Sequence, residues 1–201
     1  MGVTGVDSAA KETLLGAVIG AKVSGDVDSV GELQTLANAV AATVTYTGAA
    51  GQTAPDATQL NSLTGGTGAA HTVTPDNLSA VQAAIAAGNA DGTPIASETE
   101  LQGLIDAAIT GYNNALSTLS GFAQAQAGGL ANAIANAAIA PDLSAYAAAG
   151  VTGVDANNVN AINDALASLV IDSSLAGTAA EVQAIVNAYK AVLSEANGNL
   201  A

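Results

Sequence analysis

Hydrophobic residues along this chain recur every three or four positions, which is the spacing of one face of an α-helix. The clearest stripe consists of Val182, Ile185, Val186, Tyr189, Val192 and Leu193. Others are formed by Leu101, Leu104, Ile105, Ala108, Tyr112, Ala115, Leu116 and Leu119, and by Val159, Ile162, Leu166 and Leu169. The run at residues 42–47 is too short to insist on a strand, so we interpret it as a frayed helix end or a short extended link. The pattern predicts helices over residues 8–22, 29–44, 75–88, 97–120, 122–139, 156–169 and 178–196.

The chain also repeats itself. The hexapeptide Gly-Val-Thr-Gly-Val-Asp occurs at residues 2–7 and again, letter for letter, at residues 150–155. A Ser/Thr-x-x-Glu motif, followed by an apolar residue and Gln, begins at Ser29, Ser97 and Thr178. Matches of this kind are the sign of a repeated structural unit, which here would contain two helices.

The repeated motifs divide the chain into five segments. Three of them are two-helix repeats, and the other two are a Gly/Thr-rich linker with a short helix and a pair of Ala-rich connecting helices. In chain order, the segments are repeat 1 (2–45), the linker (46–70), repeat 2 (71–120), the connecting helices (121–149) and repeat 3 (150–198).

Each repeat carries signals that begin its helices. The Ser/Thr-x-x-Glu motif predicts a capping box at the start of the second helix, in which the hydroxyl accepts from the Glu N–H and the Glu side chain accepts from the cap N–H. For the first helix we expect Asp7, Thr74 and Asp155 as N-caps. Pro-Asp pairs at 55–56 and 141–142 predict two further helix starts, with Asp at the second helical position, where it complements the helix dipole.

The abundance of alanine bears on how these helices pack. Alanine lets helices approach closely but buries little area per contact. Several helices must therefore share one core. We expect an all-α fold, a multi-helix bundle built from three two-helix repeat units.

The composition excludes several function classes. The 201 residues are 50% hydrophobic and 2% aromatic, with no Cys and three cations, all of them lysines, against seventeen carboxylates, so that the net charge is −14. So few cations cannot neutralise a row of phosphates, and anionic membrane surfaces repel the chain. Nucleic acid is therefore not an expected partner. Without cysteine there is no disulfide, zinc–thiolate site or cysteine nucleophile.

Membrane insertion is not expected either. The most apolar span, Phe122–Ala140, is mostly alanine and contains Gln and Asn side chains that would lack partners in hydrocarbon. A buried helix of a water-soluble protein is the better interpretation. The N-terminus has neither a basic segment nor a cleavage pattern, so we expect no signal peptide there.

No residue of the sequence is assigned a catalytic, cofactor-binding or metal-binding role. His71, the single histidine, lies in a Gly-rich stretch, where a solvated linker is a simpler interpretation than a catalytic base. Glu98 and Glu100 could pair as acid and base, but both fall in a first helical turn, where carboxylates favour capping. We therefore expect no enzyme activity and no cofactor.

One segment has a partial calcium-binding pattern. Residues 26–31 resemble the opening of an EF-hand loop, with Asp26 and Asp28 at its first and third positions. Val30 and Ala37 stand at the fifth and twelfth positions, so the full site fails. The alternatives are a weak calcium contact at the two aspartates and a solvated turn.

The last repeat resembles a known class of repeats. Residues 146–163, Tyr-Ala-Ala-Ala-Gly-Val-Thr-Gly-Val-Asp-Ala-Asn-Asn-Val-Asn-Ala-Ile-Asn, resemble the Ala-rich helical tandem repeats of very large bacterial cell-surface and adhesin-type proteins, and residues 181–186 are similar to their second half. The resemblance is clear over residues 146–190 and moderate over residues 71–112. It is weaker over residues 2–40. In the last range Lys11 and Gly16 depart from the pattern. The resemblance implies an exported, tandemly repeated structural segment and supplies no functional residues.

The expected function is therefore structural. We expect a spacer or self-assembly unit of an exported surface or adhesin-like protein, located outside the cell or on its surface, with neighbouring repeats or other copies of itself as partners. A binding module for calcium, a glycan or another surface is the alternative. The chain begins within the repeated motif, so we also expect it to be a segment of a longer protein. Residues 142–149 have no counterpart before repeat 1, and the apolar surface that Leu143 and Tyr146 would cover is expected to be open there.

Overall fold

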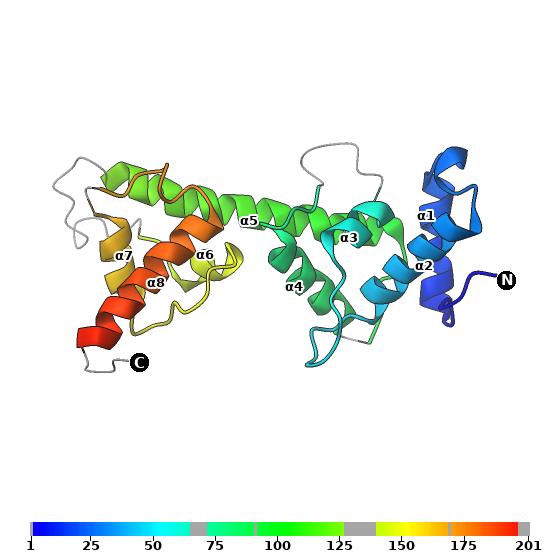
Figure 1. The fold of residues 1–201 in the computed structure, drawn as a ribbon, viewed down its shortest axis with the longest axis horizontal. Helices are drawn as coiled ribbons and strands as arrows, with labels where there is room; N and C mark the ends of the chain where they lie inside the picture. The colour runs from blue at the N-terminus through cyan, green and yellow to red at the C-terminus, as the bar shows by residue number, and fades with distance from the viewer. Residues whose placement is uncertain (1, 65–71, 91, 127–139, 169, 197–201) are drawn as a thin grey trace. The chain divides into compact units, whose positions relative to one another are not determined.

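The computed structural model describes residues 2–64, 72–90, 92–126, 140–168 and 170–196. Every regular element in these residues is helical, which confirms the predicted all-α class. The elements shown in Figure 1 are α1 (Ala9–Ala21), the 3₁₀-helix η1 (Ser24–Asp26), α2 (Val30–Thr45), α3 (Ala57–Leu63), α4 (Leu78–Asn89), α5 (Glu98–Gln126), α6 (Leu143–Ala148), α7 (Val159–Leu166) and α8 (Ala179–Ala196). Among the described helices, none is both long and apolar enough to cross a bilayer.

The chain forms two compact units, Met1–Thr110 and Gly111–Ala201, and α5 contributes to both. The core of the first unit includes Leu14, Val18, Val40, Leu60, Leu63, Val81, Ile85, Leu101 and Ile105. The core of the second unit includes Leu119, Phe122, Tyr146, Ile162, Leu166, Val182 and Val186. Each core therefore collects side chains from helices that are far apart in the sequence. The boundary between the two units falls inside the segment predicted as repeat 2, and the five segments stay a prediction.

The apolar stripes are buried for most of their length. The buried members on α5 are Leu101, Ile105, Tyr112, Ala115 and Leu119. On α8, Val182 and Val186 are fully buried, but Val192 and Leu193 are 67% and 43% exposed. The buried part of the α8 stripe therefore ends before these last two residues. Leu169 of the α7 stripe lies outside the described residues.

Helix α5 is longer than predicted. It runs without interruption through Gly121 to its end at Gln126, so the break expected between residues 120 and 122 is wrong. A glycine inside a helix costs about 1 kcal/mol relative to alanine. Burial of the neighbouring Phe122 and Ala123 offsets that cost. The rest of the predicted helix, residues 127–139, lies outside the described residues.

Helices α4 and α7 begin later than predicted, because a turn precedes each of them. Their N-caps are Asn77 and Asn158 rather than Thr74 and Asp155. The Asn77 side-chain oxygen accepts from the Thr74 N–H at 2.9 Å, and the Asn158 oxygen accepts from the Asp155 N–H at 2.8 Å. These side-chain bonds stabilise the turn and delay the helix.

The Pro-Asp pairs begin α3 and α6, but not with the predicted geometry. Asp56 and Asp142 are the N-caps of these helices and do not occupy the second helical position. The carboxylate of Asp56 accepts from the Gln59 N–H at 2.7 Å, and that of Asp142 accepts from the Ala145 N–H at 3.0 Å. A direct bond to an otherwise unpaired amide stabilises a helix start more than proximity to the dipole does.

At α1 the cap is also one residue away from the predicted position. The hydroxyl of Ser8, not the carboxylate of Asp7, accepts from the Lys11 N–H, at 3.4 Å. Asp7 accepts instead from the Lys11 ammonium group at 2.6 Å. The hydrogen bond from Lys11, together with its positive charge, holds the pKa of the Asp7 carboxyl below its usual value.

The predicted capping boxes hold at two of their three positions. At Ser29 and at Thr178 both bonds of the box are present. At Ser97 the hydroxyl accepts from the Glu100 N–H at 3.1 Å, but the Glu100 carboxylate accepts from the Ala96 N–H rather than from that of Ser97. The start of α5 is therefore capped by the Ser97 hydroxyl, but the Glu100 carboxylate binds the N–H one residue before the cap.

Removal of a capping hydroxyl is expected to destabilise the protein measurably. Thr178→Ala should lower the free energy of unfolding by about 1 kcal/mol, and Ser29→Ala by about the same amount, because each hydroxyl accepts one bond and donates another. Ser97→Ala should have a smaller effect. Urea unfolding checks the order, with the exposed Ser117→Ala on α5 as control. Equal midpoints for Thr178→Ala and Ser117→Ala would contradict the capping assignment.

The opening expected in the first unit stays a prediction, but at one place an apolar side chain fills it. Leu143 is itself 40% exposed, and Tyr146 alone is buried on α6, against Asn163. Counted from the aspartate of each hexapeptide, the place of Asn163 is taken in the first unit by Leu15, which is buried. An apolar side chain packs into the core directly and needs no tyrosine to cover it.

Candidate functional site

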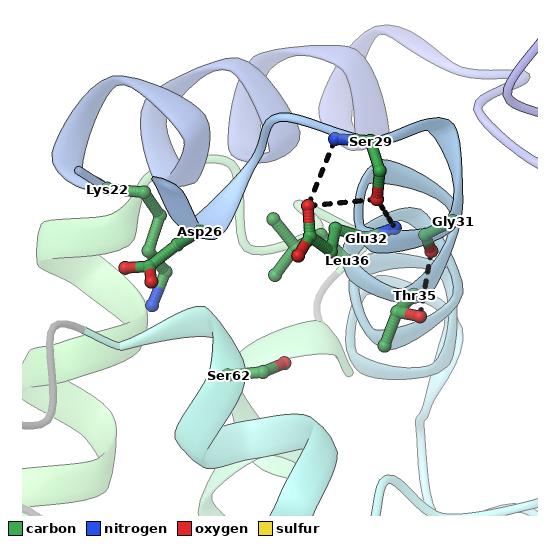
Figure 2. A pocket seen from close by; sticks show the side chains of 8 residues that line it. All are labelled: Lys22, Asp26, Ser29, Gly31, Glu32, Thr35, Leu36 and Ser62. Carbon is green, nitrogen blue, oxygen red and sulfur yellow. Dashed lines mark hydrogen bonds between the residues drawn. The ribbon is translucent and has the colours of Figure 1, made fainter. Parts of the chain in front are cut away.

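A groove of about 520 Å³ lies in the first unit, at the end of α1 and the start of α2. It is lined by Lys22, Asp26, Ser29, Gly31, Glu32, Thr35, Leu36 and Ser62, as Figure 2 shows. Asp26 of the EF-hand-like segment contributes to this lining and Asp28 does not. We call this site the α1–α2 groove.

Ser29 and Glu32 bind each other at the edge of the groove (Figure 2). The hydroxyl and the N–H of Ser29 donate to one carboxylate oxygen of Glu32 at 2.9 and 3.0 Å, and the Glu32 N–H donates to the Ser29 hydroxyl at 3.2 Å. The hydrogen bonds from Ser29 hold the pKa of the Glu32 carboxyl below its usual value. Glu32 is therefore a weak general base, and its oxygens stabilise the start of α2.

The other hydroxyls of the groove also bind the backbone. Thr35 and Ser62 donate to carbonyls of their own helices, at 3.0 and 2.7 Å. Lys22 and Asp26 are then the charged side chains of the lining that hold no helix start (Figure 2). A nucleophile with an adjacent base is required for covalent catalysis, and the residues that line this groove do not provide that pair.

The residues considered for chemistry in the sequence do not assemble into a centre. Among the described residues, no three His, Asp or Glu side chains gather where they could hold a metal ion. Glu100, in the first turn of α5, binds the N–H of Ala96 at 3.2 Å, which is a capping contact. Glu98 begins the same turn. His71 lies outside the described residues.

A second groove, of about 430 Å³, separates α5 from α6 in the second unit. It is lined by Gly111, Asn114, Ala115, Thr118, Ala140, Pro141, Asp142, Ser144, Ala145 and Ala148. The Ser144 hydroxyl donates to the Asp142 carboxylate at 2.6 Å, and this bond above all lowers the pKa of that carboxyl. Asp142, the one charged residue of this lining, thus caps the start of α6.

A glutamine clamp that the sequence analysis missed occurs in both units. The Thr4 N–H donates to the Gln34 side-chain oxygen at 2.9 Å, and the Gln34 amide donates back to the Thr4 carbonyl at 3.1 Å. Thr152 and Gln183 make the same two bonds at 2.7 and 3.1 Å. In both units the glutamine also donates to an asparagine one turn later, at 2.9 Å. A signal for the clamp exists in the sequence, because its Thr and Gln belong to the two repeated motifs.

A buried asparagine joins α4 to α2 in the first unit. Asn89 is 5% exposed, and its amide group donates to the carbonyls of Thr43 and Tyr46, both at 2.8 Å. Its oxygen accepts from the Ile95 N–H at 3.0 Å. The Asn89 side chain, at the end of α4, therefore provides hydrogen-bond donors for backbone carbonyls at the end of α2.

A second buried amide organises the second unit. Asn163 accepts from the Tyr146 hydroxyl at 2.6 Å and donates to the Pro141 carbonyl at 2.9 Å. Burial raises the pKa of the Tyr146 hydroxyl, which therefore acts as a donor and not as a base. In the first unit, Gln82 donates to the Pro55 carbonyl at the same 2.9 Å. The helix after each Pro-Asp helix thus binds the proline carbonyl with an amide side chain.

Comparison of the chain with models of protein families, with curated proteins and with solved structures gives no match. The arguments for a function therefore depend on the geometry of the chain itself.

Proposed function

We propose that the chain is a non-catalytic structural repeat segment, a spacer or self-assembly unit, of an exported bacterial surface or adhesin-like protein. The observation that carries the proposal is the glutamine clamp, which joins Thr4 to Gln34 and Thr152 to Gln183 with the same hydrogen bonds. Repeated sequence with repeated hydrogen bonding is typical of units that stack on one another. The capping motif at Ser97 extends the correspondence to a third, middle unit, so the proposal includes three two-helix repeats.

The use of the polar groups supports a structural role. Active sites gather polar side chains whose pKa values are shifted toward the pH at which they work. In the two grooves, the lowered pKa values of Glu32 and Asp142 result from capping bonds at helix starts. A carboxylate held in this way stabilises a helix and is a poor proton acceptor.

The proposed partners are neighbouring repeats of the same protein or other copies of the chain. A net charge of −14 with three cations argues against nucleic acid as a partner. The exposed apolar side chains Val23, Val30, Val192 and Leu193 argue for protein contacts. The proposed location, outside the cell or on its surface, follows from the resemblance of residues 146–190 to surface-protein repeats.

Self-association of the purified chain is expected to strengthen as salt is raised. Repulsion between copies of charge −14 opposes contact at low salt, and the screening length falls from about 30 Å at 0.01 M to about 10 Å at 0.1 M. Sedimentation velocity at both ionic strengths and several protein concentrations measures the effect. A chain that stays monomeric at high concentration in both buffers would contradict a self-assembly role and restrict the proposal to a spacer.

A binding module is the second candidate, because Lys22 and Asp26 face the α1–α2 groove without holding a helix start. A thermal-shift screen with calcium chloride and a panel of glycans separates the two candidates. Ligand at a hundred times its Kd stabilises a binding protein by about 2.7 kcal/mol, whereas a structural repeat should not respond. A shift that Asp26→Asn abolishes would overturn the structural proposal in favour of binding in this groove.

A further inference from the structure

Helices α2 and α8 are counterparts in the proposed repeat, and this inference rests on that correspondence. Both begin with a complete capping box, at Ser29 and at Thr178. Both carry the clamp glutamine at the same place after that box, as Gln34 and Gln183. The two helices can therefore be compared residue by residue along their length.

The comparison shows a difference in burial at the C-terminal ends. Val192 and Leu193 of α8 take the places of Thr43 and Val44 of α2. Thr43 is fully buried and Val44 is 6% exposed, whereas Val192 is 67% and Leu193 43% exposed. The larger, more apolar pair is thus the one in contact with water. The solvent-facing side of a helix normally carries polar or charged side chains, and this exposed pair is apolar.

The burial on α2 has an identifiable cause. Helices α3 and α4 pack against α2, as Figure 1 shows for the first unit. Leu60 and Leu63 of α3 are fully buried in the shared core. Asn89 of α4 donates to the carbonyls of Thr43 and Tyr46 at the end of α2. A short Pro-Asp helix and the helix after it therefore cover the end of the preceding long helix.

The second long helix shows the same order. α5 is followed by α6, which Asp142 of the second Pro-Asp pair begins, and the groove between them is lined by residues of both helices. On α5, Gly111 takes the place of Thr43 and contributes to that lining. Three described helices, α2, α5 and α8, begin with the Ser/Thr-x-x-Glu motif. Of these, α8 is the one without a described Pro-Asp helix after it.

We propose that the C-terminal half of α8 is a docking face for a Pro-Asp helix together with the first helix of another repeat, packed as α3 and α4 pack against α2. The exposed part of the face consists of Ala188, Val192 and Leu193, and it is bordered by Ile185 and Tyr189, which are partly buried against the second unit's own core. Leucines in the places of Leu60 and Leu63 cover its apolar side chains. An amide in the place of Asn89 donates to the carbonyls of the last turn, which contains no basic side chain of its own.

The absence of cysteine from the chain makes accessibility of this face simple to measure. Val192→Cys places a single thiol on the face. A second version carries residues 47–126 joined directly after Glu195, which takes the place of Tyr46, so that a copy of α3, α4 and α5 follows α8. The probe is a maleimide reagent, used at dilutions at which sedimentation shows a monomer. The labelling rate of the introduced thiol is expected to fall by about tenfold or more in the extended chain, because labelling then requires local opening.

Two controls are matched to this experiment. Asn187→Cys lies on α8 at the place of Asn38, which is exposed on α2 and does not line the α1–α2 groove, so its labelling rate should be the same in both chains. Leu60→Asp and Leu63→Asp, made in the appended copy alone, should restore fast labelling of the thiol at position 192. Circular dichroism reports whether the appended residues are helical.

Equal labelling of the Val192→Cys thiol in the two chains would overturn the proposal, as would an appended segment that stays unfolded while α8 is helical. Protection in the unextended chain that grows with its concentration would assign the face to a second copy and overturn it as well. Failure here is distinct from failure of the proposed function. A stabilising ligand would refute the structural role without changing protection at position 192, and an unprotected thiol there would leave the ligand screen and the salt dependence as they are.

Discussion

Asn89→Ala is expected to lower the free energy of unfolding by about 3 kcal/mol, because three hydrogen bonds of about 1 kcal/mol each are lost from a buried site. Two of these bonds satisfy the carbonyls of Thr43 and Tyr46, and the third satisfies the N–H of Ile95. In a site that is 5% exposed, groups that lose their hydrogen-bond partner have little access to water, which makes their burial costly. The loss should therefore exceed that of a capping hydroxyl.

Urea unfolding measures this effect, with Asn113→Ala as the matched control. Asn113 is exposed on α5, and its replacement should change stability by less than about 0.5 kcal/mol. Asn89→Leu tests the cause, because it keeps the side-chain volume and removes the bonding groups. Stability of Asn89→Leu close to that of the unaltered chain would show that packing, not hydrogen bonding, is what the site requires.

Asn163→Ala is expected to cost about 2–3 kcal/mol in the second unit, because it removes two hydrogen bonds and leaves the Tyr146 hydroxyl buried without its acceptor. The Pro141 carbonyl loses its donor in the same variant. A second substitution can remove one part of this cost, namely the burial of an unpaired hydroxyl. In the Asn163→Ala background, Tyr146→Phe should therefore recover part of the lost stability.

A double-mutant cycle measures the coupling between these two side chains. Tyr146→Phe, Asn163→Ala and the double variant are compared with the unaltered chain by urea unfolding, and the interaction energy should be about 1 kcal/mol or more. Tyr189→Phe on α8, which is partly buried outside this network, is the control for loss of a tyrosine hydroxyl. Strictly additive losses would show that the 2.6 Å contact between the two side chains contributes nothing to stability.

The two grooves could not be predicted from the sequence, although some of the residues that line them belong to motifs that the sequence does reveal. Ser29 and Glu32 are recognisable as a capping box, and the structure adds that the box forms one edge of the α1–α2 groove. That edge exists because η1 and α3 come to lie beside α2. The EF-hand-like segment pairs Asp26 with Asp28, yet in the groove Asp26 lies beside Lys22, and Asp28 is not part of the lining (Figure 2).

The sequence by itself determined the helices, some of their caps and the repetition between the two ends of the chain. These features depend on residues within about one or two helical turns of each other, so periodicity and short motifs are sufficient to predict them. The capping boxes at Ser29 and Thr178 are of this kind. The helix end predicted at residue 120 is wrong because burial of Phe122 and Ala123 outweighs the intrinsic cost of Gly121 in a helix.

The tertiary structure alone decided which parts of the stripes are buried and how the amide side chains are used. Asn89 and Asn163 bind carbonyls that are 46 and 22 residues away, and no local pattern indicates such a partner. On α8, Val186 is buried and Val192 is exposed although both belong to one stripe. Periodicity specifies which face of a helix is apolar, but burial depends on whether another element lies over that face, and only the assembled chain supplies that element.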